Sequence, residues 1–130
     1  VFRMKYLLDT HSYIWYVEDD KQLSRNALNI IDNPDNELYL SIVSIWEITI
    51  KSSLNKLNLK QSISNIYDEL NKLNIEILSL EKKNFEILYN LEFFHRDPFD
   101  RMIISQAITE NLPIISKDIA FNNYKIERIW

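Results

Sequence analysis

The chain contains no glycine and no cysteine among its 130 residues, and each absence excludes particular kinds of site. Walker and dinucleotide-binding loops need glycine for tight turns and for close approach of the backbone to phosphate, so neither loop is present. Without cysteine there are no disulfides, thiolate nucleophiles or cysteine-bound zinc ions. No apolar run approaches the roughly 18 residues of a membrane span, and the N-terminus lacks the pattern of a secretory signal. We therefore expect a soluble, cytoplasmic protein that does not contact membranes.

The net charge and the length of the chain further restrict the kind of protein it can be. A net charge of −4 argues against a broadly basic surface for nucleic acid, so a polyanionic substrate has to be bound locally. A length of 130 residues with 46% hydrophobic content suits one domain with a sizeable core. We predict that domain over residues 4–130, and we expect residues 1–3, which precede Met4, to be an added remnant.

Short apolar runs alternate with amphipathic segments along the chain. Strands are predicted at residues 5–9, 38–42, 76–80, 112–116 and 125–130, and helices at 13–17, 24–32, 44–54, 62–73, 81–91 and 98–110. The strands are apolar throughout rather than alternating, which is typical of a parallel sheet buried on both faces. The predicted fold class is therefore α/β, a three-layer α/β/α arrangement around a mainly parallel sheet.

Four acids lie where a predicted strand ends or a predicted helix begins: Asp9, Glu47, Asp100 and Asp118. Strand ends and the helix N-termini that follow them gather along one edge of an open α/β sheet, so these carboxylates can converge. Without a cation, each close pair would repel by about 4 kcal/mol at a separation of about 4 Å. Oxygen ligands without cysteine suit Mg²⁺ or Mn²⁺ better than zinc. Because a metal-bound water attacks phosphodiesters, the pattern predicts a metal-dependent nuclease.

Each acid also has a structural interpretation as part of a helix cap. Ser44 and Glu47 fit the spacing of a capping box. Asp97 followed by Pro98 fits a helix start, with Asp100 favourably placed near the positive end of the helix dipole. For these two segments the structural and the functional interpretations have about equal weight.

The remaining two acids differ in how well a cap explains them. Asp118 can cap a short helical turn, so on its own it is weak evidence for a metal site. Asp9 closes an apolar strand, and Ser12 is the better candidate cap for the helix that follows. Asp9 is therefore the strongest single member, and the conjunction of all four acids favours a metal site.

Other charged side chains near these acids are less informative. His11 and His95 are the only histidines, and a histidine in a loop is more often a surface or supporting group than a catalyst. The cations Arg96, Arg101 and Lys117 flank the acids and are candidate contacts to substrate phosphates. Such cations also form ordinary solvated ion pairs, so both interpretations stay open.

Four segments in this order resemble the PIN-domain ribonucleases and, within them, the VapC-type toxins of bacterial toxin-antitoxin modules. They are residues 6–11 (YLLDTH), 41–51 (SIVSIWEITIK), 95–104 (HRDPFDRMII) and 116–118 (SKD), and the resemblance spans about residues 5–129. Asn55 stands where related sequences often have glycine, and we expect a changed turn there, because asparagine tolerates left-handed conformations.

The resemblance implies a set of site residues and partners. The implied metal ligands are Asp9, Glu47, Asp100 and Asp118, with Asp97 as a recurrent companion and Thr10 and Ser116 as supporting polar groups. It further implies dependence on Mg²⁺ or Mn²⁺, endonucleolytic cleavage of RNA, a homodimer, and inhibition by a cognate antitoxin.

Two other classes of function compete with this prediction. A PIN-like binding module, with the acids acting only as caps, would bind no metal. A phosphotransfer domain with an aspartate nucleophile is disfavoured, because dehalogenase-like phosphatases want a second aspartate where His11 stands. Response-regulator receivers usually have paired acids after the first strand, which this chain lacks.

Overall fold

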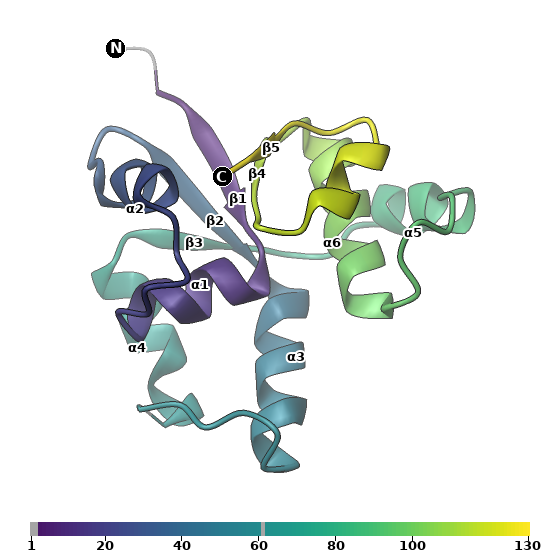
Figure 1. Cartoon of the computed structure of the whole chain (residues 1–130). Coiled ribbons are helices and arrows are strands. Elements are labelled where there is room, and N and C mark those ends of the chain that lie inside the picture. Colours follow the sequence, from purple (N-terminus) through teal and green to yellow (C-terminus); the bar gives the residue numbers. More distant parts are fainter. Residues whose placement is uncertain (1–2, 61) are drawn as a thin grey trace.

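The computed structural model describes residues 3–60 and 62–130, which form three layers with a sheet between helices (Figure 1). The sheet has five strands in the order β3-β2-β1-β4-β5, and every neighbouring pair is parallel. The strands are β1 Lys5–Leu8, β2 Glu37–Ser41, β3 Ile75–Leu78, β4 Ile114–Ile115 and β5 Arg128–Ile129. The predicted three-layer α/β/α fold with a mainly parallel sheet is confirmed.

Helices connect the strands and cover both faces of the sheet (Figure 1). The α-helices are α1 Thr10–Val17, α2 Arg25–Asp32, α3 Ile42–Ser53, α4 Ile66–Lys72, α5 Lys82–Tyr89 and α6 Pro98–Glu110. Two 3₁₀ helices, η1 Ile63–Asn65 and η2 Ile119–Asn123, precede α4 and β5. The helix predicted at residues 62–73 is therefore divided between η1 and α4.

Strand β1 separates two apolar cores because successive side chains of a strand point to opposite faces. Leu8 belongs to one core, together with Tyr13 of α1 and Leu70 of α4. Leu7 belongs to the other core, together with Ile103 of α6. Both leucines are fully buried, so the end of β1 and the residue that follows it, Asp9, have a fixed position.

Two helices begin earlier than the sequence predicts. Asp9 caps α1, because its carboxylate accepts a hydrogen bond from Ser12 N at 2.8 Å, so Ser12 is not the cap. Ser41 caps α3 by accepting from Val43 N, and the predicted capping box of Ser44 and Glu47 is wrong. The reason is that β1 and β2 pass almost directly into their helices: Asp9, the single residue between β1 and α1, is one cap, and Ser41, the last residue of β2, is the other.

Asparagine and aspartate take the left-handed backbone positions in this glycine-free chain. Positive φ values occur at Asp19, Asn55, Asn74 and Asn111, and these are non-glycine residues that visit this region most readily. Asn111 ends α6 in this conformation. Asn55 has a φ of 54°, in the left-handed region that asparagine tolerates.

The last two strands are shorter than predicted. The segment predicted at 112–116 forms a ladder only at Ile114 and Ile115, and Pro113 just before them has no N–H to donate. The segment predicted at 125–130 pairs only through Arg128 and Ile129, opposite the two residues of its single neighbour, β4.

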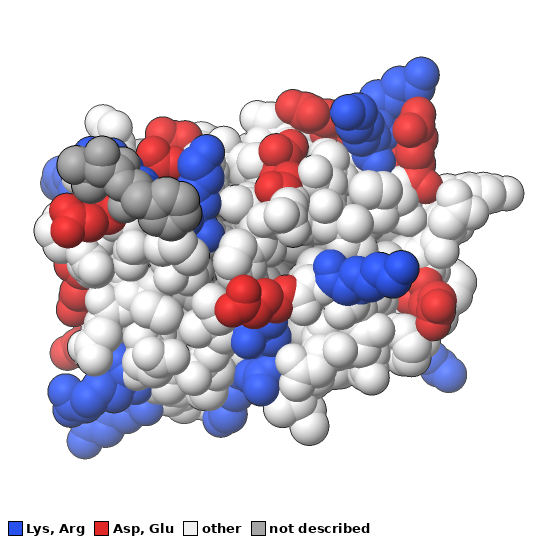
Figure 2. Space-filling model, turned by 90° about the horizontal axis from the view of Figure 1, so that it is seen from above, with Lys and Arg blue, Asp and Glu red and all other residues white. Residues whose placement is uncertain are grey.

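The surface has mixed charge. On the face drawn in Figure 2, lysine and arginine side chains are interspersed with aspartate and glutamate and form no continuous basic patch. Within residues 3–60 and 62–130, no helix has the length and apolar character needed to cross a membrane. Val1 and Phe2, which belong to the expected remnant, lie outside the described residues.

Candidate metal centre

The four predicted ligands lie along the edge of the sheet formed by the carboxyl ends of the strands. Asp9 follows β1, Glu47 is in the helix that follows β2, and Asp118 comes after β4. Strand order places β1 between β2 and β4, so these three connections are neighbours in space. Asp100 joins them from the first turn of α6.

Asp9 is held firmly at the base of the site. Its side chain is buried, and its backbone N donates to Ile115 O at 3.1 Å, which fixes the end of β1 against β4. Burial raises the pKa of Asp9, while hydrogen bonds from Ser116 and Ser12 act in the opposite direction. The position and the partners agree with a carboxylate that a cation would help to ionise.

Glu47 lies in the second turn of α3 and is almost fully buried. Thr10 Oγ1 lies 2.8 Å from Glu47 Oε1 and, because a carboxylate only accepts, the threonine donates. Lys51, one turn later on α3, donates to the other oxygen and forms an ion pair with it. The hydrogen bond with Glu47 is the main reason why the pKa of Lys51 is raised.

The pKa of Asp100 is affected both by burial and by the charges of the other acids of the site. Burial raises its pKa to about 7, and the charges of Asp97, Glu47, Asp9 and Asp118 add to the effect. Asp9, Glu47 and Asp118 are therefore close enough to Asp100 for their charges to act on it. Since a divalent cation would relieve this repulsion, the arrangement fits a cation-binding site better than a set of independent caps.

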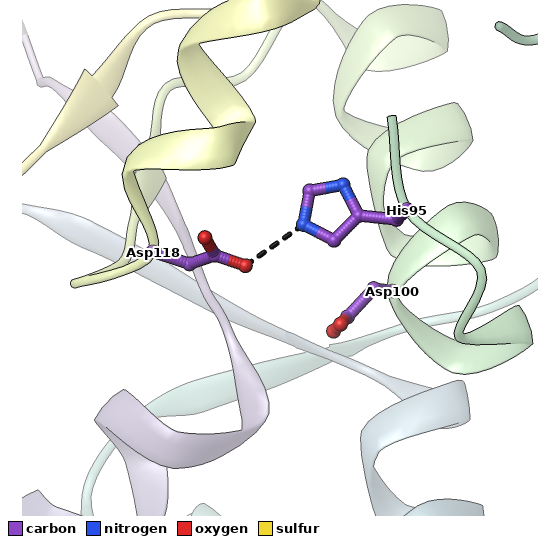
Figure 3. A group of neighbouring side chains, drawn as sticks. All are labelled: His95, Asp100 and Asp118. Atoms are coloured by element: carbon purple, nitrogen blue, oxygen red, sulfur yellow. Dashed lines mark hydrogen bonds and ion pairs between the residues drawn. The ribbon is translucent and has the colours of Figure 1, made fainter. Parts of the chain in front are cut away.

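Asp118 faces Asp100 across the site and contacts a histidine (Figure 3). Its Oδ1 accepts from Ala120 N at 3.0 Å and caps η2, and its Oδ2 lies 2.8 Å from His95 Nε2. Burial acts to raise the pKa of Asp118, but the hydrogen bonds from His95 and Ala120 outweigh it, and the pKa is lowered. Asp118 is therefore held as a carboxylate.

A compact group of possible ligand atoms includes His95, which the sequence did not lead us to select as a ligand. Among the described residues, single atoms of His95, Asp100 and Asp118 all lie within 4.8 Å of one another. Asp9 and Glu47 stand outside this group, although their charges act on Asp100.

Two of the predicted supporting residues, Asp97 and Ser116, form hydrogen bonds next to the acids. Asp97 caps α6 by accepting from Phe99 N at 2.8 Å and from Asp100 N at 3.4 Å, so it orients the turn that carries Asp100. Ser116 is fully buried, and its Oγ accepts from Asp118 N at 3.0 Å. Both residues therefore position acids of the site.

The three candidate phosphate contacts differ in whether their charged groups are buried or exposed. Arg101 is buried, and its guanidinium donates to the carbonyl oxygens of Leu91, Glu92 and His95 at 3.0 to 3.3 Å. Its charge is used to hold the preceding loop, which replaces the predicted contact with substrate. Arg96 and Lys117 are exposed and keep their charged groups available.

The sequence did not lead us to assign two residues, Lys51 and His95, to the site. Lys51 was identifiable, because a lysine four residues after a glutamate on a helix is a common ion pair. His95 was noted but not assigned, because its partner Asp118 is 23 residues away and no local pattern joins them. His11, the other histidine, is exposed, and its ring centroid lies 5.6 Å from that of Trp15.

The donor set fits a hard divalent cation. Asp9, Glu47, Asp100 and Asp118 supply carboxylate oxygens, which Mg²⁺ and Mn²⁺ prefer. Asp100 is held in surroundings that disfavour its charge, as its pKa of about 7 shows. A cation beside it would offset this penalty.

Comparisons with known proteins agree with this geometry. The family model described as PIN domain matches residues 6–127. No curated protein matches the chain.

Several solved structures share the fold over nearly the whole chain. The structure of VapBC2 from Rickettsia felis bound to a promoter DNA fragment matches with a TM-score of 0.70 and 18% identity, covering 97% of this chain and 98% of that chain. VapBC-1 from nontypeable Haemophilus influenzae matches with a TM-score of 0.72 and 18% identity, covering 97% of each chain. FitAcB from Neisseria gonorrhoeae matches with a TM-score of 0.65 and 15% identity, covering 96% of each chain.

Proposed function

Because this chain belongs to the PIN domain family, whose members are generally nucleases, we propose that it is a metal-dependent endoribonuclease and the toxin of a toxin-antitoxin system. The observation that carries the proposal is the placement of four carboxylates along one edge of the sheet, where Asp100 and Asp118 lie closest together. Burial, with the charges of the neighbouring acids adding to it, raises the pKa of Asp100 to about 7. A site of this kind is suited to a divalent cation and to phosphodiester hydrolysis.

Different residues of the chain would bind the metal and orient its ligands. Asp9, Glu47, Asp100 and Asp118 would hold Mg²⁺ or Mn²⁺, which supplies an activated water and offsets charge on the phosphoryl oxygens. Thr10 orients Glu47 through its hydroxyl, and this leaves the glutamate fixed before substrate arrives.

Binding of a polyanion rests on local cations. Arg96 and Lys117 are exposed beside the acids and are the proposed contacts to RNA phosphates. With a formal net charge of −4, long-range attraction of RNA is weak, so affinity depends on the bound metal and these two side chains. Charge-removing substitutions at both positions should raise KM more than they lower kcat.

The proposed partners follow from the same comparisons. The neighbouring structures from Rickettsia felis, Haemophilus influenzae and Neisseria gonorrhoeae are VapBC and FitAcB proteins, and another is described as a toxin-antitoxin complex from Klebsiella pneumoniae. We propose a cognate antitoxin that inhibits the enzyme, a homodimer, and action in the cytoplasm. Co-expression with the product of an adjacent small gene should relieve growth arrest.

Cleavage of RNA tests the proposal directly. The purified chain should cut RNA internally in the presence of Mg²⁺ or Mn²⁺ and stop on addition of EDTA. Asp9→Asn and Asp100→Asn should each lose activity while staying folded. Asp68→Asn is a matched control, because Asp68 is an exposed acid in the first turn of α4, away from the four carboxylates. Full activity in both site variants would refute the proposal.

A binding module without catalysis is the second candidate, because Asp9, Asp97 and Asp118 all cap helices. In that case the acids would serve stability alone. Calorimetry separates the two functions: a catalytic site binds Mn²⁺ and loses this binding in Asp100→Asn. If the wild-type chain binds no Mn²⁺ at millimolar concentration and the variants only lose stability, the binding module is correct.

A further inference from the structure

We propose that His95 and Tyr124 are positioning residues of the metal centre, in which Tyr124 orients the imidazole and the imidazole holds the carboxylate of Asp118 toward Asp100. The inference rests on the proposed function, since it assigns a role within the same site. It differs from the metal-ligand assignment because neither residue is required to touch the cation.

The imidazole of His95 packs against two aromatic rings, and each of its nitrogens has a hydrogen-bond partner. It is buried, and its ring centroid lies 4.7 Å from that of Phe121 and 5.5 Å from that of Tyr124, nearly parallel to the latter at 27°. Phe94 packs edge-on against the outer side of Tyr124 at 5.2 Å. Such a ring has little freedom to rotate, so its Nε2 points steadily into the site (Figure 3).

The hydrogen bonds around this ring form one complete chain. Asp118 accepts at Oδ2, 2.8 Å from Nε2, so Nε2 carries the hydrogen and Nδ1 is the acceptor of the neutral ring. Tyr124 Oη lies 3.1 Å from Nδ1 and accepts from the backbone N of His95 at 2.9 Å. The phenol hydrogen is then free to be donated to Nδ1. Each donor has an acceptor, and the tautomer is specified.

The loop that carries His95 is held by the same helix that carries Asp100. Arg101 donates to the carbonyl oxygens of Leu91, Glu92 and His95, which locks the backbone on both sides of the loop. Asp100 and Arg101 are adjacent on α6, so the two halves of the site move together. His95 therefore links Asp118 to the loop that α6 holds in place.

These hydrogen bonds leave the carboxylate of Asp118 able to coordinate a cation. Its Oδ1 already accepts from Ala120 N and its Oδ2 from His95, yet each carboxylate oxygen has a second lone pair. Removal of the imidazole would allow this carboxylate, whose side chain is 44% exposed, to rotate toward solvent. Outer hydrogen bonds to metal ligands typically contribute about 10- to 100-fold in metal affinity.

Calorimetric titration of the full chain with Mn²⁺ tests the inference. His95→Ala should weaken Mn²⁺ binding by about 10- to 100-fold. His95→Gln should restore most of the affinity, because its amide nitrogen reaches the place of Nε2, whereas His95→Asn should not. Tyr124→Phe should weaken binding less than His95→Ala, since the ring stays but loses its partner at Nδ1.

Tyr13→Phe is the matched control for loss of stability alone. Tyr13 is buried and its phenol donates to Glu69 at 2.7 Å, so the variant loses a buried phenol hydrogen bond far from Asp118 in the chain. It should bind Mn²⁺ like the wild type. Rescue by His95→Gln guards against misfolding of His95→Ala, because a merely structural role for the ring would not distinguish Gln from Asn.

The outcomes separate the inference from the proposed function. If the wild-type chain binds Mn²⁺ and Asp100→Asn does not, while His95→Ala binds like the wild type, the positioning role is refuted and the proposed function stands. Strong ¹⁴N coupling from a coordinated imidazole in the electron spin echo spectrum of the Mn²⁺-loaded chain would also overturn it, because His95 would then be a ligand. If the wild-type chain binds no Mn²⁺ and cuts no RNA, both fail.

Discussion

Asp100→Asn should make the metal-free chain more stable at neutral and mildly alkaline pH, although it removes a proposed ligand. Burial, together with the charges of Asp97 and Glu47 and other acids, raises the pKa of Asp100 from 3.8 to about 7. Between these two values the folded chain holds a proton that the unfolded chain has released. The free energy of unfolding therefore falls as pH rises through this window and levels off above pH 7.

The size of the effect follows from the pKa. A change from 3.8 to about 7 corresponds to about 4 kcal/mol of unfolding free energy. Asparagine has nearly the shape of the protonated acid and cannot ionise, so the variant avoids this loss. The difference in free energy of unfolding between variant and wild type should grow from near zero at about pH 4 to about 4 kcal/mol at about pH 8.

Urea unfolding in EDTA, followed by tryptophan fluorescence across this pH range, measures the difference. Asp68→Asn is the control, because its exposed carboxyl in α4 lies outside the acid cluster. Addition of Mg²⁺ at pH 8 should stabilise the wild type and leave Asp100→Asn nearly unchanged, since a ligand stabilises only the state that binds it. A stability difference that stays constant with pH, or a variant less stable than the wild type at pH 8, would refute the reasoning.

Three further substitutions test other parts of the site. Lys51→Met should tighten Mn²⁺ binding in calorimetry, because the ammonium competes with the cation for Glu47; weaker binding would contradict this. Arg101→Met should lower the free energy of unfolding by about 2 to 4 kcal/mol in urea, because three carbonyl oxygens lose a charged donor. Thr10→Val should weaken Mn²⁺ binding by about 10-fold, and an unchanged affinity would show that its hydroxyl does not orient the glutamate.

The sheet and the acid positions were predictable because they depend on short-range patterns. The apolar runs that became β1 and β2 are continuous, and this is what burial on both faces requires. Asp97 was predicted as the cap of α6 from its place before Pro98, and the structure agrees. Local sequence and parallel topology together therefore place the acids on one edge.

The helix starts were predicted less well, because several residues near each start can cap. Ser44 and Glu47 have the spacing of a capping box, yet Ser41 is the cap and Ser44 lies inside α3. The hydroxyl of Ser44 lies 2.8 Å from Thr10 Oγ1, which explains why a buried serine stands there. A pattern that fits a cap in sequence was in fact a contact between α3 and α1.

The contacts that complete the site could not be predicted, because they join residues far apart in the chain. His95 reaches Asp118 across 23 positions and Tyr124 across 29. Arg101 was assigned to substrate because cations beside acids suggest phosphate binding, whereas its actual partners are backbone carbonyls. A guanidinium that binds main-chain oxygens leaves no recognisable pattern in the sequence.

Capping and metal binding are not competing explanations for these acids. A parallel sheet brings helix starts to the edge where its strands end, so a residue suited to begin a helix is also brought to the site. Asp118 shows how one carboxylate could serve both purposes: Oδ1 caps η2, while Oδ2 accepts from His95 and keeps a second lone pair. The cap fixes the carboxylate before a cation arrives, which lowers the entropy lost on binding. A cap at Asp9 or Asp118 is therefore compatible with the metal-site interpretation, and loss of Mn²⁺ affinity in Asp118→Asn, whose amide oxygen still accepts from Ala120 N, would separate coordination from capping.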